Sequence, residues 1–311
     1  MNEEAAFVRA MLDAPEDTAL RLVFADWLEE RGDPRGELLR LTHMLTQAID
    51  VPQRAELEAH MQALLRDGVQ PVGPYWTNKI GMRFAWVPAG TFLMGSPKAE
   101  AERREDETQH EVTLTRGFWL SVYPVTQHQW QTVMGHNPSW FCFEGGGKED
   151  VKGLVTEDFP VEQVSWDEAM AFCSRLARLE HGGIDTCRLP SEEEWEYACR
   201  AGTQTPFHFG ATLDGKDANY NGNYPYGTSA KTKFLGRTSE AGVYVANAFG
   251  LHDMHGNVWE WTSSVQGLAR GYRGGCWLHS AALSAAARRC WMEPTERWMI
   301  LGFRLLGVPS K

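Results

Sequence analysis

The sequence predicts an α+β fold in which a small all-helical domain precedes a larger domain with little regular structure. Helical periodicity runs through the first 68 residues, whereas short, irregular strand-like segments follow from about residue 78. The chain also holds 30 glycines and 13 tryptophans among 311 residues, which favours long loops over a strand–helix repeat. Because 43% of the residues are hydrophobic, one sizeable core and a smaller domain can both form. We expect a helical domain at 1–68, a linker at 69–77 and the main domain at 78–311.

Three helices are predicted in the first domain. Asp17 is a good N-cap for the first, and Gly32 lies just past its end. Asp33 and Pro34 supply the cap and first-turn proline of the second. The apolar faces of the three helices consist of Leu20, Val23, Phe24, Trp27 and Leu28; Leu38, Leu41 and Leu45; and Leu57, Met61, Leu64 and Leu65. The stretch "LRLVFADWLEERGDPRGELLRL" resembles a repeat-companion domain found at the N-terminus of planctomycete and myxobacterial proteins.

The main domain is predicted to mix strands and helices. Alternation at 82–86, broken at 88–90, predicts a hairpin, and "HEVTL" predicts a further strand. Two capping boxes, Ser165 with Glu168 and Ser191 with Glu194, predict that helices begin there. The linker prediction rests on the glycines and prolines between 68 and 74.

Charge and composition exclude several classes of protein. The net charge of −11 and a pI near 5.4, with no Lys/Arg cluster, argue against nucleic-acid binding. No apolar run approaches the ~18 residues of a membrane span, and the N-terminus lacks the features of a signal peptide. We therefore expect a cytoplasmic protein with no membrane partner, whose six cysteines are mostly buried thiols.

A set of motifs in one order carries a family resemblance. The motifs are "GTFLMGS" (90–96), "YPVTQHQWQTVMGHNPSWF" (123–141), "PVEQVSWDEAMAFC" (160–173), "RLPSEEEWEYACRAG" (188–202), "NAFGLHDMHGNVWEWTSS" (247–264), "RGGCW" (273–277) and "LGFRL" (301–305). Over residues of about 78 to 308 the chain resembles the formylglycine-generating enzyme, or sulfatase-modifying factor, family. The resemblance implies an enlarged C-type-lectin-like fold with a ligand face built from the C-terminal segment.

The resemblance also identifies where catalytic cysteines would stand. Members with the activity bind copper(I) through two cysteines and oxidise a substrate cysteine with oxygen. At those two positions this chain has His279 and Ser284, and we therefore expect no copper and no catalytic residue. A displaced metal site at Cys276, His279 and Cys290 is the alternative, although nothing in the sequence directs Cys290 toward the other two.

The motif "DMHGNVWEW" carries a calcium prediction. The resemblance implies ligands from the Asp253 side chain, the carbonyls of Gly256 and Val258, and the Glu260 carboxylate. Hard oxygen ligands from a turn match calcium chemistry. The alternative is that Asp253 and Glu260 only form hydrogen bonds within the turn.

The C-terminal segment also resembles a branch of binding proteins in the same fold family, the variable proteins of diversity-generating retroelements. In these proteins the frame of the segment is fixed and side chains between its markers vary. The corresponding positions, which we predict to form a binding surface, are Leu278, His279, Ser280, Leu283, Cys290, Trp291, Met292, Glu296, Trp298, Met299 and Ile300. Large Trp and Met side chains are typical of protein contacts, which predicts a protein ligand.

The sequence therefore favours a non-catalytic recognition protein, possessing a displayed C-terminal surface that a retroelement could diversify. One alternative is an oxygen-dependent formylglycine-generating oxidase. Others are an inactive relative whose aromatic side chains fill a groove, and an adaptor that binds a second protein through its N-terminal helices.

Overall fold

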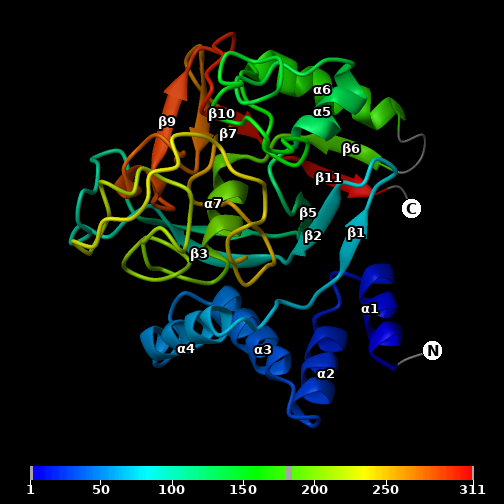
Figure 1. Cartoon of the computed structure of the whole chain (residues 1–311). Coiled ribbons are helices and arrows are strands. Elements are labelled where there is room, and N and C mark those ends of the chain that lie inside the picture. Colours follow the sequence, from blue (N-terminus) through cyan, green and yellow to red (C-terminus); the bar gives the residue numbers. More distant parts are fainter. Residues whose placement is uncertain (1–2, 180–183, 310–311) are drawn as a thin grey trace.

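The N-terminal part is a layer of helices that lies against one side of the larger domain (Figure 1). The computed structural model describes residues 3–179 and 184–309. The helices are α1 (Glu3–Asp13), α2 (Thr18–Glu29), α3 (Pro34–Gln47) and α4 (Arg54–Arg66). Asp17 and Asp33 accept hydrogen bonds from backbone N–H groups at the starts of α2 and α3, as predicted. The first helix, α1, was not predicted.

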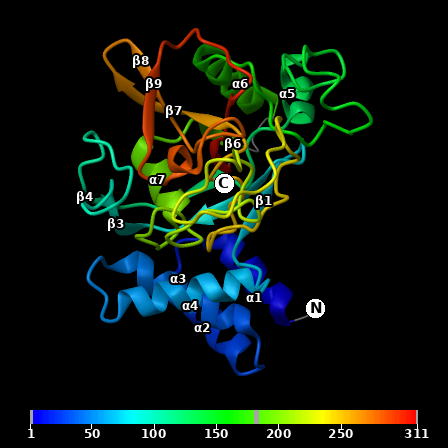
Figure 2. The same ribbon diagram turned by 60° about the vertical axis from the view of Figure 1, so that its left-hand side comes forward.

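The helical layer and the larger domain share hydrophobic core. Leu41 and Leu45 of α3 and Met61 of α4 belong to one buried cluster with Val87 and Trp195 of the larger domain. Hydrogen bonds reinforce the contact, because Arg54 donates to the Gly202 carbonyl (2.5 Å) and Glu58 accepts from the Gln204 N–H (3.0 Å). The apolar faces of α3 and α4 are therefore buried against the main domain as well as against their own neighbours (Figure 2).

Within residues 69–179 and 184–309, three sheets form the main domain. Their strands are β1 (Tyr75–Thr77), β2 (Arg83–Val87), β3 (Gly90–Met94), β4 (His110–Leu114), β5 (Phe118–Ser121), β6 (Ile184–Arg188), β7 (Trp259–Gln266), β8 (Ala269–Arg273), β9 (Arg289–Met292), β10 (Leu301–Phe303) and β11 (Leu306–Pro309). The strand orders are β1-β2-β5-β11-β6, β10-β7-β8-β9 and β3-β4. In the second sheet β10 runs parallel to β7, and β9 is an edge strand. The last residues of the predicted linker, 75–77, are thus part of a sheet.

The predicted hairpin around residues 88–90 does not form. Strand β2 pairs with β1 and β5, whereas β3 pairs with β4. The five-stranded sheet has core on both faces, since Phe84 and Trp119 lie in one hydrophobic cluster and Ala85 and Leu120 in another. Strand β2 has β1 on one edge and β5 on the other, which leaves neither of its edges for β3.

Helices and long loops complete the domain. The helices are α5 (Gln127–Met134), α6 (Trp166–Leu179), α7 (Glu192–Arg200) and the 3-10 turn η1 (Ala281–Ser284). The capping boxes predicted at Ser165 and Ser191 are present. Residues 201–258 contain no helix or strand apart from isolated bridges, which confirms the predicted α+β fold with little regular structure. Within the described ranges, no helix is both long and apolar enough to span a bilayer.

Candidate functional site

A buried arginine fixes the first end of the C-terminal segment. Arg273, in β8, has no exposed surface and forms ion pairs with Glu196 (2.6 Å) and Glu192 (3.3 Å) of α7. Its Nη1 also donates to the carbonyls of residues 286, 287 and 288, at 3.2, 3.0 and 3.0 Å. One guanidinium therefore holds the backbone of 286–288 against α7, independently of the side chains at those three positions.

The glycines after Arg273 are required by close contacts. Gly274 and Gly275 have φ values of +102° and +75°, which residues other than glycine rarely adopt. A Cβ at Gly275 would lie 2.1 Å from the Oγ of Ser284. The Arg-Gly-Gly motif thus lets residues 274–275 pass directly beside η1.

A second buried arginine fixes the other end of the segment. Arg304 follows β10 and has no exposed surface. It donates to both oxygens of Glu260, at 2.7 and 2.8 Å, and to the carbonyls of Ser121 (3.0 Å) and His252 (2.8 Å). Arg304 therefore ties the end of the segment to β5, β7 and the loop before β7.

The first of the two predicted copper positions, His279, is partly buried and bonded to neighbouring side chains. Nδ1 of His279 accepts a hydrogen bond from the Trp259 indole at 3.0 Å and lies 3.3 Å from the Cys276 Sγ. Burial raises the pKa of Cys276 to about 12 and lowers the pKa of His279. Cys276 is therefore a thiol, and His279 is a neutral acceptor for Trp259.

The second position, Ser284, is also enclosed. It has no exposed surface, and its Oγ has no hydrogen-bond partner among the described residues. Cys290 lies elsewhere, on β9 and opposite Tyr272 of β8. Over the described part of the chain, no three His, Cys, Asp or Glu side chains are grouped in a way that could hold a metal ion.

The predicted binding surface divides by burial. Leu278 and Trp298 are 36% and 44% exposed, and Glu296 is also exposed. The half-buried members are His279, Ser280, Leu283, Cys290, Trp291, Met292 and Met299. Ile300 is 5% exposed and belongs to the main hydrophobic cluster, so its prediction as a displayed side chain is wrong. The cause is its position next to β10, where the Ile300 carbonyl accepts the Trp259 N–H.

Main-chain bonds hold the loop between β9 and β10. The carbonyls of Pro294 and Trp298 accept the N–H groups of Trp166 and Gln163, at 2.9 and 3.0 Å. The carbonyl of Met299 accepts the indole N–H of Trp277 at 3.3 Å. These contacts use backbone carbonyls and do not depend on side-chain identity; among the exposed side chains of the loop, Arg297 adds an ion pair with Glu168 of α6 at 2.8 Å.

The calcium positions lie close together, but Glu260 does not fit the ion as arranged. Both of its oxygens are held by Arg304, and one also accepts the Trp195 indole N–H at 2.7 Å. Asp253, at φ +55°, accepts from the Gly242 N–H at 2.7 Å, and burial raises its pKa to about 6. A calcium ion would have to share an oxygen of Glu260 with Arg304. Binding at Asp253, Gly256, Val258 and Glu260 thus stays a prediction, and the structure gives Glu260 the role of an arginine partner.

Sequence reasoning missed a buried polar group beside the segment. Nδ1 of His255 lies 2.7 Å from the Ser284 carbonyl, and its Nε2 accepts from the His208 N–H at 3.2 Å. Burial lowers the pKa of His255 to about 4, which keeps the ring neutral. The histidine spacing within "HDMHG" gave no signal for this role, because the partners come from residues 208 and 284.

Comparison with known protein families shows which family the chain belongs to. A family model described as the sulfatase-modifying factor enzyme 1-like domain matches residues 68–307. The protein belongs to this family. Inactive C-alpha-formylglycine-generating enzyme 2 of Mus musculus is 36% identical over 273 residues, which cover 70% of this chain and 83% of that protein. Formylglycine-generating enzyme of Mus musculus is 27% identical over 221 residues. That alignment covers 57% of this chain and 56% of the mouse enzyme, about half its length.

Solved structures of this fold confirm the architecture. PvdO from Pseudomonas aeruginosa superposes with a TM-score of 0.62 at 26% identity, over 75% of this chain and 97% of that one. Treponema denticola variable protein 1 superposes with a TM-score of 0.60 at 24% identity, over 76% and 99%. The main domain therefore has the fold of the sulfatase-modifying factor family, and a variable protein has a similar fold.

Proposed function

We propose that this sulfatase-modifying factor relative is a non-catalytic recognition protein that presents its C-terminal segment, residues 278–299, to a protein ligand. The observation that carries the proposal is the state of the two positions where active members carry cysteines. His279 there serves as a hydrogen-bond acceptor for Trp259, and Ser284 is enclosed beside Gly275. Neither supplies the thiolate that copper(I) requires.

The nearby cysteine does not replace the missing pair. Cys276 has no exposed surface, and its pKa of about 12 keeps it protonated at neutral pH. Of the two protonation states of cysteine, the thiolate is the one that binds a metal ion or attacks a disulfide. Cys276 is therefore a buried partner of His279 in this proposal.

The displayed side chains support recognition of a protein. Trp298 and Leu278 are exposed apolar residues, and Trp291 and Met292 lie half-buried on the edge strand β9. Aromatic and Met side chains are enriched where proteins bind one another. The buried arginines at both ends hold the frame, so the exposed Leu278 and Trp298 can change without disturbing it, whereas Met292 also packs against the core.

The relatives include proteins of both kinds. The mouse protein at 36% identity is named as inactive, and the mouse protein at 27% identity is named as the enzyme, so a non-catalytic member of this family has a precedent. The variable protein of Treponema denticola adds likeness of fold. The alternative function, an oxygen-dependent formylglycine-generating oxidase, would have to work without the cysteine pair.

An enzymatic assay separates the two functions. A Cys-x-Pro-x-Arg peptide, incubated with the full-length protein, copper(I) and oxygen, should remain unmodified by mass spectrometry, while mouse formylglycine-generating enzyme serves as the positive control. An aldehyde product that requires oxygen and disappears in Cys276→Ala would establish the oxidase and reject the recognition function.

Partner capture tests the surface itself. Wild type and Trp298→Ala would be used to capture partners from the organism of origin, with Phe143→Ala as the matched control because Phe143 is an 88% exposed aromatic outside the segment. We expect a partner that is retained by the control and reduced at least tenfold by Trp298→Ala, as for an aromatic anchor at a contact. Equal retention by both variants would remove Trp298 from the binding surface.

A further inference from the structure

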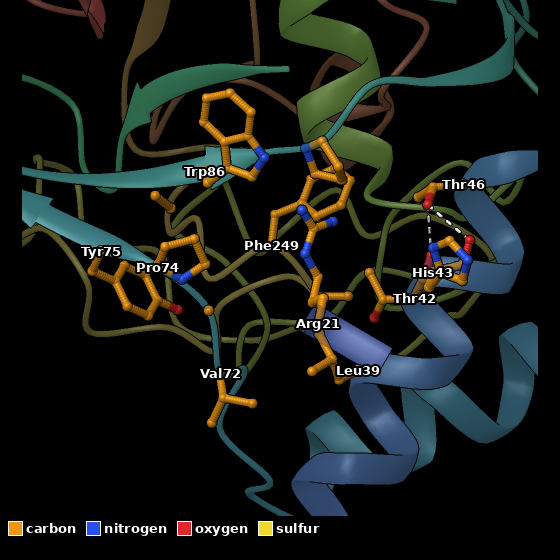
Figure 3. Close-up of a pocket in the computed structure, with 14 residues that line it drawn as sticks. Arg21, Leu39, Thr42, His43, Thr46, Val72, Pro74, Tyr75, Trp86 and Phe249 are labelled. Carbon is orange, nitrogen blue, oxygen red and sulfur yellow. Dashed lines mark hydrogen bonds between the residues drawn. The ribbon is translucent and has the colours of Figure 1, made fainter. Parts of the chain in front are cut away.

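A small cavity lies between the helical layer and the main domain, outside the C-terminal segment. It has a volume of about 40 Å³ and is lined by α2, α3, the stretch 72–75, β2 and Phe249 (Figure 3). A larger cavity of about 370 Å³ adjoins it. Arg21, Trp86 and Pro88 line both spaces, and they therefore stand at the passage from one to the other.

Arg21 is a buried cation without an acidic partner. The residue is 7% exposed, and its Nη2 donates to the Pro15 carbonyl at 2.5 Å. Among the described residues it forms no salt bridge, and no acceptor contacts its Nε or Nη1. The nearby Asp17 carboxylate is used as the N-cap of α2. Burial lowers the pKa of Arg21, which measures the cost of enclosing this charge.

A second unused donor faces the same space. The indole Nε1 of Trp86 is buried and has no hydrogen-bond partner among the described residues. Figure 3 shows the Arg21 side chain reaching from α2 toward the strand that carries Trp86. Buried donors are nearly always paired, and an acceptor in this cavity would satisfy the Trp86 Nε1 and face the Arg21 guanidinium at the same time.

The charge and shape of the cavity define that acceptor. His43 and Arg21 line the inner space, and Arg116 lines the outer one, where Glu16 is the acidic residue. A guanidinium matches the two oxygens of a carboxylate through parallel hydrogen bonds. The inner space suits a group of that size, and the outer space suits the remainder of a small molecule.

We propose that this cavity binds the carboxylate group of a small organic acid, with Arg21 and the Trp86 indole as its donors. Arg21 comes from α2 and Trp86 from β2, so the bound acid contacts both parts of the chain. Because it binds the assembled state, the acid stabilises the contact between the helical layer and the main domain.

Thermal unfolding of the full-length protein tests the proposal with sodium acetate and sodium succinate as probes, against sodium chloride at equal ionic strength. Both carboxylates should raise the melting temperature of wild type in a saturable way. Trp86→Phe removes one N–H and should weaken the apparent Kd about tenfold, in line with the loss of one hydrogen bond to a charged group. Arg21→Met should abolish the response, and the exposed Arg9→Met serves as the matched control and should keep it.

Three results would overturn the proposal. These are the absence of a saturable response in wild type, an unchanged Kd in Trp86→Phe, and a chloride response equal to that of acetate. The last would replace carboxylate recognition by binding of any anion. If Arg21→Met does not fold, Trp86→Phe alone decides, because it keeps an aromatic side chain at this position and removes the indole N–H.

Discussion

Arg273 and Arg304 have no exposed surface, whereas Trp298, which lies between them in the sequence, is 44% exposed. The arginines bind backbone carbonyls and buried glutamates, while the Trp298 indole donates to Glu296 at the surface (3.1 Å). Within one segment, the ends are therefore fixed by buried charges, whereas the middle is held by main-chain hydrogen bonds and one exposed ion pair, Arg297–Glu168. The difference teaches that this fold can hold a loop in place without specifying its side chains.

The largest expected effect comes from Arg304. Arg304→Met leaves Glu260 buried without a cation, and we expect a loss of about 3–5 kcal/mol in the free energy of unfolding, measured by urea denaturation. Arg297→Met is the matched control, because its pair with Glu168 is largely exposed and is worth about 1 kcal/mol or less. Equal losses in the two variants would contradict the distinction between the ends and the middle.

A melting experiment can distinguish whether Glu260 is a partner of Arg304 or a calcium ligand. Glu260→Gln should lower the melting temperature by the same amount in calcium and in a chelator, because Arg304 loses its partner in both conditions. A destabilisation confined to the calcium-containing sample would restore Glu260 as a calcium ligand, and with it the set Asp253, Gly256, Val258 and Glu260.

Two tryptophans sharpen the same comparison. Trp277 is 4% exposed, and Trp277→Ala should cost about 3–5 kcal/mol through the cavity it leaves. Trp298→Ala should stay within about 0.5 kcal/mol, as for most surface substitutions. Melting curves of the two variants measure the difference, and the half-buried Trp291→Ala should fall between them. A loss of several kcal/mol in Trp298→Ala would place that side chain in the core.

The smallest effect concerns two thiols. Because the thiolate is the reactive form, Cys276, with a pKa of about 12, should resist iodoacetamide at pH 8 in the native protein. Cys290 is half-buried on an edge strand and should react first. Peptide mapping after timed alkylation gives the order, and faster modification of Cys276 would show that the interior opens readily.

The features that could be predicted from the sequence are those that depend on a few neighbouring residues. The caps at Asp17, Asp33 and Ser191 need only a few neighbouring residues, and the structure confirms them. The hairpin at 88–90 failed because strand pairing in this domain is set by distant partners, as β2 with β5 demonstrates. Ile300 failed for a related reason, since its burial depends on contacts that β10 makes with β7.

The ordered motifs predicted the family and the position of its segment, but not the electrostatics of the site. Nothing near Glu260 in the sequence indicates Arg304 as its partner, because Glu260 lies in β7 and Arg304 follows β10, 44 residues later in the chain. The same limit applied to the helical layer. The apolar faces of α3 and α4 predicted burial, while the main-domain strand that α3 packs against, β3, could not be predicted from them.

The shared core of α3, α4 and the main domain has a practical consequence for dissecting the gene. The family match begins at residue 68, which invites removal of everything before it. Such a truncation would remove the contact that α3 makes with β3, which carries the buried Phe92 and Met94, and would expose an apolar face. A misleading pull-down with the shortened protein would follow, because its non-specific adhesion would arise from the cut rather than from the segment near the C-terminus.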